Sequence, residues 1–168
     1  LCEHLATRYR IFAVDLRGRG NSDYDTNPAN YHPGTYAADI ISLLDELALQ
    51  SAIIIGTSLG GLVSMILAAT HAQRIAAVVL NDIGPEADQA GLDRIKAYVC
   101  NPSPVSNWDE AVAKTKSIQG REYPNFSEAD WLTFSKNLYK ESPDGKPILA
   151  YDPAIATLLQ QPIAAPSA

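Results

Sequence analysis

The feature that most constrains the fold is an alternation of apolar runs and helical patterns in the first half of the chain. Short runs rich in β-branched and aromatic residues end in turn residues, as buried strands do, at 9–16, 51–57 and 75–82. Between them, an amphipathic pattern at 35–49 and an apolar stretch at 59–72 predict two helices. Strands that are apolar throughout and joined by helices predict an α/β fold, with a parallel sheet covered by helices on both faces.

The second half has a different character. Three helical patterns are separated by breaks that contain proline or glycine, at residues 88–100, 107–119 and 127–141. Asn107 with Glu110, and Ser127 with Asp130, have the spacing of a helix capping box. The stretch SPDGKP (142–147) predicts a turn, and the remaining residues predict no closing element.

Composition limits the classes of function. The chain has 168 residues, a size that fits one globular domain, and a formal net charge of −6 argues against nucleic-acid binding, which needs a basic surface. No apolar run approaches the roughly 18 residues of a membrane span, so no membrane partner is expected. Cys2 and Cys100 have neither zinc-site nor disulfide-framework spacing, which predicts two ordinary buried thiols in a cytoplasmic protein.

The stretch GTSLG (56–60) matches the G-x-S-x-G pattern between a predicted strand and a predicted helix. In this position the pattern predicts a sharp turn that exposes the serine hydroxyl at the carboxyl edge of the sheet. Gly56 and Gly60 would make room for the crossing, and the Leu59 amide at the helix N-terminus would stabilise an oxyanion. Ser58 is therefore a candidate nucleophile, and the alternative is a structural serine in a glycine-rich bend.

Three segments together resemble the α/β-hydrolase superfamily. FAVDLRGRGNSD (12–23) is similar to the family's D-x-R-G-x-G-x-S segment, and IIIGTSLGGLVSMILAA (53–69) is similar to its nucleophile elbow and following helix. VVLNDIGPE (78–86) is similar to the strand that precedes an inserted helical cap. The order and spacing of the three segments make the match far more specific than the elbow alone.

The resemblance implies a division of the chain. Residues 1–86 would form part of the α/β core, and residues 87–160 would form a helical cap that shapes the acyl or leaving-group pocket. Residues 161–168 would be a tail or linker.

A cofactor is not expected. GRGNSD (18–23) has the first two glycines of a dinucleotide loop, but Asp23 stands at the third position and a loop rich in Asn and Pro follows. Arg17 and Asp23 are predicted to brace this loop instead. No residue spacing predicts a metal site.

The resemblance also implies a catalytic histidine and an acid beyond the cap, and the chain offers neither in the family's position. His4 lies in the opening helix, His71 ends the nucleophile helix about 20 Å from Ser58, and His32 lies in a loop without a family context. Asp82, at the end of the third predicted strand, is an alternative acid that some family members use. Alternatively, Asp82 is a structural residue that forms a turn by bonding to its own backbone.

The sequence therefore leads to one principal hypothesis and two alternatives. The start that resembles the end of a helix, the missing histidine and the Pro/Ala ending suggest the middle and cap of a longer hydrolase, completed by a missing or separate segment. We expect cleavage of a carboxylic ester, or a related acyl bond, of a small-molecule substrate through an acyl-enzyme on Ser58. Carbon–carbon bond hydrolysis on the same elbow and a non-catalytic binding module remain open.

Overall fold

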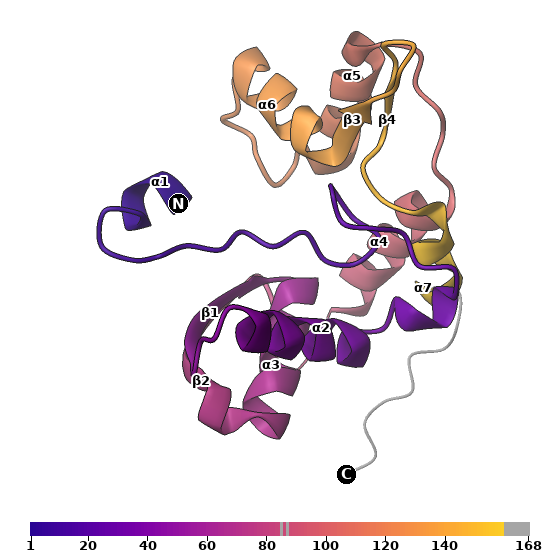
Figure 1. The fold of residues 1–168 in the computed structure, drawn as a ribbon. Coiled ribbons are helices and arrows are strands. Elements are labelled where there is room, and N and C mark those ends of the chain that lie inside the picture. The colour runs from indigo at the N-terminus through magenta and orange to yellow at the C-terminus, as the bar shows by residue number, and fades with distance from the viewer. Residues whose placement is uncertain (85, 87, 160–168) are drawn as a thin grey trace.

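The structure is a computed structural model and describes residues 1–84, 86 and 88–159. The first half contains α1 (Cys2–Leu5), η1 (Pro28–Asn30), α2 (Pro33–Glu46), β1 (Ala52–Thr57), α3 (Leu59–Thr70), η2 (Ala72–Arg74) and β2 (Ile75–Asn81). The second half contains α4 (Gln89–Cys100), α5 (Trp108–Gln119), α6 (Glu128–Leu138), β3 (Tyr139–Glu141), β4 (Pro147–Leu149), η3 (Pro153–Ile155) and α7 (Ala156–Leu159). Figure 1 shows β1, β2, α2 and α3 grouped in one part of the molecule and α5 and α6 in another.

The sheet of the first half has two parallel strands. β1 pairs with β2 in a register that sets Ile53 opposite Ala77 and Ile55 opposite Val79. The α/β class and the strands predicted at 51–57 and 75–82 are thus confirmed. The strand predicted at 9–16 is wrong, because a strand requires a hydrogen-bonded neighbour and the described residues supply none for this extended segment.

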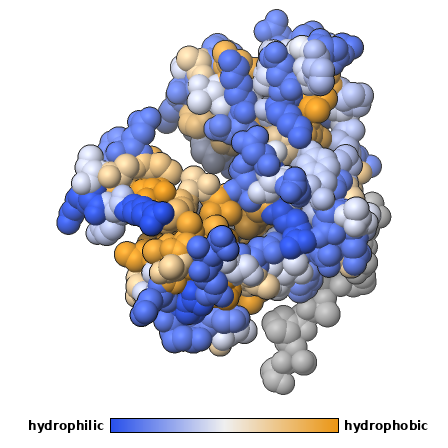
Figure 2. Space-filling view, in the orientation of Figure 1, coloured by the Kyte–Doolittle hydropathy of each residue, from blue (hydrophilic) through white to orange (hydrophobic). Residues whose placement is uncertain are grey.

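The two faces of this sheet differ. α3 packs against β1 and β2, and Gly56 faces this helix. On the opposite face, Ile53, Ile55 and Val79 keep 52%, 45% and 50% of their surface exposed. Figure 2 shows apolar surface gathered around the sheet and the extended N-terminal segment, whereas the part that contains α5 and α6 is mostly polar on this side. Within the described part of the chain, the helices therefore cover one face of the sheet.

The main core lies where α2 and α3 meet. Tyr36 and Ala37 from α2 are buried with Val63 and Leu67 from α3, and Ile155 of η3 joins them from the far end of the chain. α2 begins two residues before Thr35, the predicted start, because Pro33 occupies its first turn and His32 accepts a hydrogen bond from the Gly34 amide. Burial at i, i+3, i+4 spacing follows the predicted helical periodicity.

In the second half, α5 and α6 pack against each other and are followed by a hairpin. The predicted cap at Ser127 is a full capping box with Asp130, and Asn107 accepts a hydrogen bond from the Glu110 amide. The third predicted helix is too long, since α6 ends at Leu138 and the chain turns through residues 142–146 into an antiparallel β3–β4 hairpin. Aromatic rings from α6 and the preceding loop pack together. Tyr123 stacks on Phe126, and Trp131 meets Phe126 and Phe134 edge to face.

The end of the described chain returns to the first half. The Gly20 amide donates to the Ala150 carbonyl at 2.7 Å, and the Asp152 amide donates to the Gly18 carbonyl at 2.7 Å. η3 and α7 then follow, so the expectation of an open ending is wrong up to residue 159. The predicted tail, 161–168, lies outside the described residues.

Two further expectations concern the cysteines and the membrane. Both thiols are free, but Cys2 is exposed and Cys100 is half-buried, which corrects the prediction that both are buried. Among the helices of residues 1–84 and 88–159, none is long and apolar enough to cross a membrane.

Candidate active site

Ser58 occupies a strained turn between β1 and α3. Its backbone has φ 50° and ψ −114°, a conformation that non-glycine residues rarely adopt. The turn is held in place because the Ser58 amide donates to the Asn81 carbonyl at 3.0 Å, and the Ser58 carbonyl accepts from Gly61 at 2.9 Å. Its hydroxyl oxygen accepts no capping hydrogen bond from the amides of the helix, and the hydroxyl has no other hydrogen-bond partner among the described residues. The strain is characteristic of a functional turn rather than an ordinary bend.

The glycines around Ser58 have different roles. A Cβ at Gly56 would overlap the Gly60 carbonyl and the Ser64 hydroxyl, and a Cβ at Gly61 would overlap the Ile83 side chain. A Cβ at Gly60 would meet nothing within 4 Å. The close crossing of strand and helix therefore depends on Gly56 and Gly61. The expectation that Gly60 also makes room for the crossing is wrong, because the space beside Gly60 is open.

Leu59 is the first residue of α3, so its backbone N–H has no acceptor within the helix. The Gly61 and Leu62 amides are occupied by the Ser58 carbonyl. The free amide beside Ser58, at the positive end of the helix dipole, can donate to an oxygen that gains negative charge.

Asp82 follows β2 at the same edge of the sheet. Its neighbour Asn81 is paired with Thr57 in the β1–β2 register and accepts the Ser58 amide hydrogen bond. Asp82 has φ 55°, a left-handed conformation that aspartate tolerates better than most residues. The structure thus brings Ser58 and the start of the Asp82 loop to one edge, and Asp82 accepts no hydrogen bond from a described residue.

The three histidines are not brought to Ser58. His4 is exposed in α1, and His32 caps the start of α2. His71 follows the last residue of α3 and its Nδ1 lies 2.8 Å from the Thr70 hydroxyl. A helix of 12 residues spans about 18 Å, so His71 and Ser58 lie at opposite ends. The structure of these residues therefore contains a candidate nucleophile and oxyanion donor without a neighbouring histidine.

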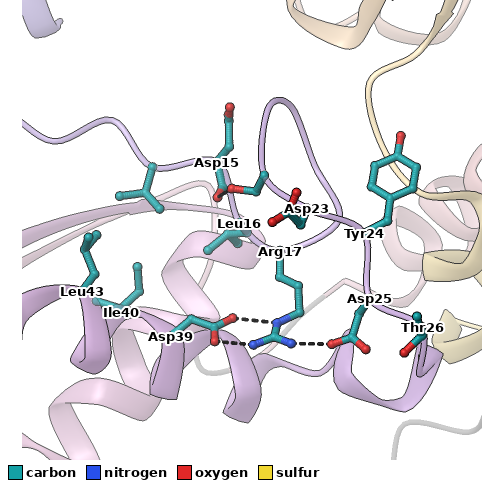
Figure 3. A pocket seen from close by; sticks show the side chains of 12 residues that line it. Asp15, Leu16, Arg17, Asp23, Tyr24, Asp25, Thr26, Asp39, Ile40 and Leu43 are labelled. Carbon is teal, nitrogen blue, oxygen red and sulfur yellow. Dashed lines mark hydrogen bonds and ion pairs between the residues drawn. The ribbon is translucent and has the colours of Figure 1, made fainter. Parts of the chain in front are cut away.

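The loop after the extended N-terminal segment is fixed by an arginine that binds two carboxylates (Figure 3). Arg17 donates from Nε and Nη2 to Asp39 of α2, at 3.0 and 2.6 Å, and from Nη1 to Asp25. The three residues joined by these bonds line an open surface pocket of about 530 Å³. Arg17 thus braces the loop as predicted. Asp23, its predicted companion, contributes its backbone carbonyl to Gly18, at 2.9 Å.

Asp25 and Tyr31 extend this network to Asp152, far along the chain. A hydrogen bond from the Asn27 amide, followed by one from the Asn30 side chain, holds the pKa of Asp25 below its ordinary value. Tyr31 is 3% exposed and donates its hydroxyl proton to Asp152. Burial raises the pKa of Tyr31, and this hydrogen bond raises it further. Sequence spacing could not have found these partners, because Tyr31 and Asp152 lie 121 positions apart.

Side chains of the metal-binding types lie apart in the described part of the chain. Across residues 1–84, 86 and 88–159, no three side chains of His, Cys, Asp or Glu come together in a group that could hold a metal ion. Asp25 and Asp39 are instead occupied by Arg17. The sheet edge presents the strained Ser58 turn and, beside it, the Leu59 amide at the start of α3.

Comparison with known proteins places this arrangement in a family. A family model described as "alpha/beta hydrolase fold" matches residues 1–139. A 3-hydroxybutyrate-oligomer hydrolase of Cupriavidus necator is 30% identical over 88% of this chain and 51% of its own length. A 2-(acetamidomethylene)succinate hydrolase of Mesorhizobium japonicum is 35% identical over 72% of this chain and 42% of its own length. The chain therefore spans about half the length of these relatives.

A solved structure agrees with these relatives. The crystal structure of an alpha/beta hydrolase from Novosphingobium aromaticivorans has a TM-score of 0.87 and 38% sequence identity, and the match covers 99% of this chain and 60% of that one. The elbow at Ser58, the matching family model and this neighbour all lead to the same result. The chain belongs to the α/β-hydrolase family.

Proposed function

We propose that this hydrolase cleaves a carboxylic ester, or a related acyl bond, through an acyl-enzyme on Ser58. The observation that carries the proposal is the strained Ser58 backbone, with φ 50°, beside the free Leu59 amide at the start of α3. Such a turn holds the serine oxygen and an oxyanion donor next to each other before the substrate arrives.

The chemistry would proceed in two steps. The Ser58 oxygen attacks the acyl carbon, its proton passes to a base, and the Leu59 N–H donates to the oxyanion. The base then protonates the leaving alcohol, and water repeats the sequence to release the acid. Asp82, which reaches the same sheet edge, is the proposed acid that orients the base.

The base itself is proposed to come from a segment outside these 168 residues. Two observations support such a segment. The three histidines of the chain all lie away from Ser58. On one face of the β1–β2 sheet, the apolar side chains of Ile53, Ile55 and Val79 are about half exposed, whereas parallel sheets usually have both faces covered. We propose that the same missing or separate segment covers this face. The predicted division into a core of residues 1–86 and a helical cap of residues 87–160 belongs to this proposal.

The names of two relatives support a substrate class. The hydrolases of Cupriavidus necator and Mesorhizobium japonicum are named for a 3-hydroxybutyrate oligomer and for 2-(acetamidomethylene)succinate, and both names denote derivatives of carboxylic acids. We therefore propose a small carboxylic-acid derivative as the substrate. Carbon–carbon bond hydrolysis would use the same serine turn and is distinguished by its products.

A non-catalytic binding module is the second candidate, and it is favoured by the positions of the three histidines. The two candidates are separated by measuring the intact mass after treatment with a fluorophosphonate, which modifies activated serines. The experiment uses the protein expressed from its complete gene. We expect one adduct on the wild type and on Ser42→Ala, an exposed serine of α2, and none on Ser58→Ala. An unmodified wild type would favour the binding module, and an adduct that persists in Ser58→Ala would refute the nucleophile.

A further inference from the structure

The last part of the proposed cap, residues 150–155, connects its helices to the core and is called the return segment below. Its first residue, Ala150, donates its amide to the carbonyl of Leu138, the last residue of α6, at 2.9 Å. The Ala150 carbonyl accepts from the Gly20 amide, in the loop of residues 17–31, at 2.7 Å. Figure 1 shows this part of the chain running from the region of α5 and α6 to α7. One residue is therefore bonded both to a helix of the proposed cap and to a loop of the first half.

Asp152 fastens the return segment to the same loop. Its backbone amide donates to the Gly18 carbonyl at 2.7 Å, and one of its carboxylate oxygens accepts the hydroxyl proton of Tyr31. The other carboxylate oxygen accepts from the Ala154 amide at 2.9 Å and caps η3. Both oxygens are thus occupied, and the negative charge makes the bond to Tyr31 stronger than a bond between two neutral groups.

Tyr31 holds its hydroxyl in a fixed position for this bond. The side chain is 3% exposed, and the hydroxyl accepts from the Asp25 amide at 2.7 Å while it donates to Asp152. A Cβ at Gly18 would overlap the Tyr31 ring, so the ring lies directly against the backbone that also binds the Asp152 amide. Loss of the hydroxyl would leave a carboxylate oxygen of the half-buried Asp152 without its donor, which weakens the attachment of the return segment.

The return segment also contacts the main core beside the candidate active site. Tyr31 and Ile155 belong to one buried cluster, and Leu59 packs against that cluster. Leu59 is the first residue of α3 and directly follows Ser58. The segment that carries the proposed cap is therefore seated on the same group of side chains as the residue that supplies the oxyanion donor.

We propose that the hydrogen bond between Tyr31 and Asp152 positions the proposed cap relative to Ser58 and so determines how tightly the enzyme binds esters with long acyl chains. Both are positioning residues, because they act through the cap and touch no reacting atom. The inference rests on the proposed function and deepens it by assigning residues that control acyl-chain specificity. The Ser58 turn is held separately by Asn81 and Gly61, so loss of this bond changes substrate binding and leaves the chemical step unchanged.

The test compares KM and kcat for p-nitrophenyl acetate and p-nitrophenyl octanoate, with the protein expressed from its complete gene. Tyr31→Phe removes the hydroxyl and keeps the ring. We expect its KM for the octanoate to rise roughly fivefold with kcat unchanged, and both constants for the short acetate to stay the same.

Tyr36→Phe is the matched control. Tyr36 is 1% exposed, and its hydroxyl accepts from Arg19 at 2.9 Å. That bond joins the loop to α2 and not to the return segment, so its loss should change neither ester's KM.

Amide hydrogen exchange tests the attachment without turnover. In Tyr31→Phe we expect faster exchange in the peptides that contain Gly20 and Asp152, whose amides bond between the loop and the return segment. Exchange in α3 should stay the same, because its amides are bonded within the helix and within the Ser58 turn.

Three results would overturn the proposal. The first is an unchanged KM for the octanoate in Tyr31→Phe. The second is an equal rise for both esters, or a fall in kcat, which would show that the bond only stabilises the fold. The third is unchanged exchange at Gly20 and Asp152. A wild type that forms no fluorophosphonate adduct and cleaves neither ester would refute the proposed function, and the exchange result would then decide alone whether Tyr31 and Asp152 hold the return segment.

Discussion

The two faces of the β1–β2 sheet carry similar residues and have opposite surroundings. The face toward α3 is closed so tightly that Gly56 has no room for a Cβ, and Leu67 of α3 is fully buried. The other face presents Ile53, Ile55 and Val79 half exposed. The apolar sequence of a strand therefore indicates only that a face of the sheet is suited to burial. Whether that face is buried depends on the element that packs against it. Substitutions on the two faces should differ accordingly.

The largest effect is expected at Leu67, on the covered side. Leu67→Ala removes a side chain with 0% exposure and leaves a cavity between α2 and α3. We expect the free energy of unfolding in urea to fall by about 2–5 kcal/mol. Leu62→Ala is the matched control, since Leu62 lies on the same helix with 37% of its surface exposed, and should cost much less. Equal losses at the two positions would show that the core does not lie at this interface.

A smaller effect is expected from adding a methyl group at the elbow. Gly56→Ala forces a Cβ against the Gly60 carbonyl and the Ser64 hydroxyl, and we expect a loss of about 1–3 kcal/mol in urea unfolding. Gly60→Ala meets open space and lies in the first turn of α3, where alanine is the better helix former. Its stability should stay the same or rise by up to about 1 kcal/mol. A larger loss at Gly60 than at Gly56 would contradict the close crossing seen here.

The smallest effect is expected on the uncovered face. Ile55→Thr keeps the β-branched shape of a residue that is 45% exposed, so its stability in the 168-residue chain should change by no more than about 0.5 kcal/mol. Light scattering should show less self-association of Ile55→Thr than of the unsubstituted chain, because the substitution makes an exposed apolar patch smaller. In the protein from the complete gene, a loss well above that value would show that another segment covers this face. The same small change in both forms would show that the face is exposed in the whole protein.

Local signals in the sequence predicted several elements well. The caps at Asn107 and Ser127 and the turn at 142–146 depend on nearby residues, and the structure confirms each. The prediction of a strand at 9–16 is wrong because residue preferences alone do not form a strand. A strand also needs a hydrogen-bonded neighbour, which the residue pattern does not reveal. The helix predicted at 127–141 includes the residues of β3, because three residues are too few for a period of two or of 3.6 to be recognised.

The candidate site divides in the same way. The G-x-S-x-G pattern was enough to locate Ser58 and Leu59, because the whole turn is encoded within five consecutive residues. It could not assign the packing role of Gly61, which depends on Ile83 from another strand end. Nor could it find Asp25 and Asp39 as partners of Arg17, since these bonds join elements that lie apart in the sequence.

The sequence alone determined the alternation of strands and helices, the strained serine turn and, through three spaced segments, the family. Each of these follows from the preferences of neighbouring residues and from a period of two or 3.6. The tertiary structure decided which face of the sheet is covered, which glycines the elbow needs and which carboxylates Arg17 binds. These properties depend on elements that meet only after folding, and the Tyr31–Asp152 hydrogen bond, across 121 residues, shows how far apart such partners lie.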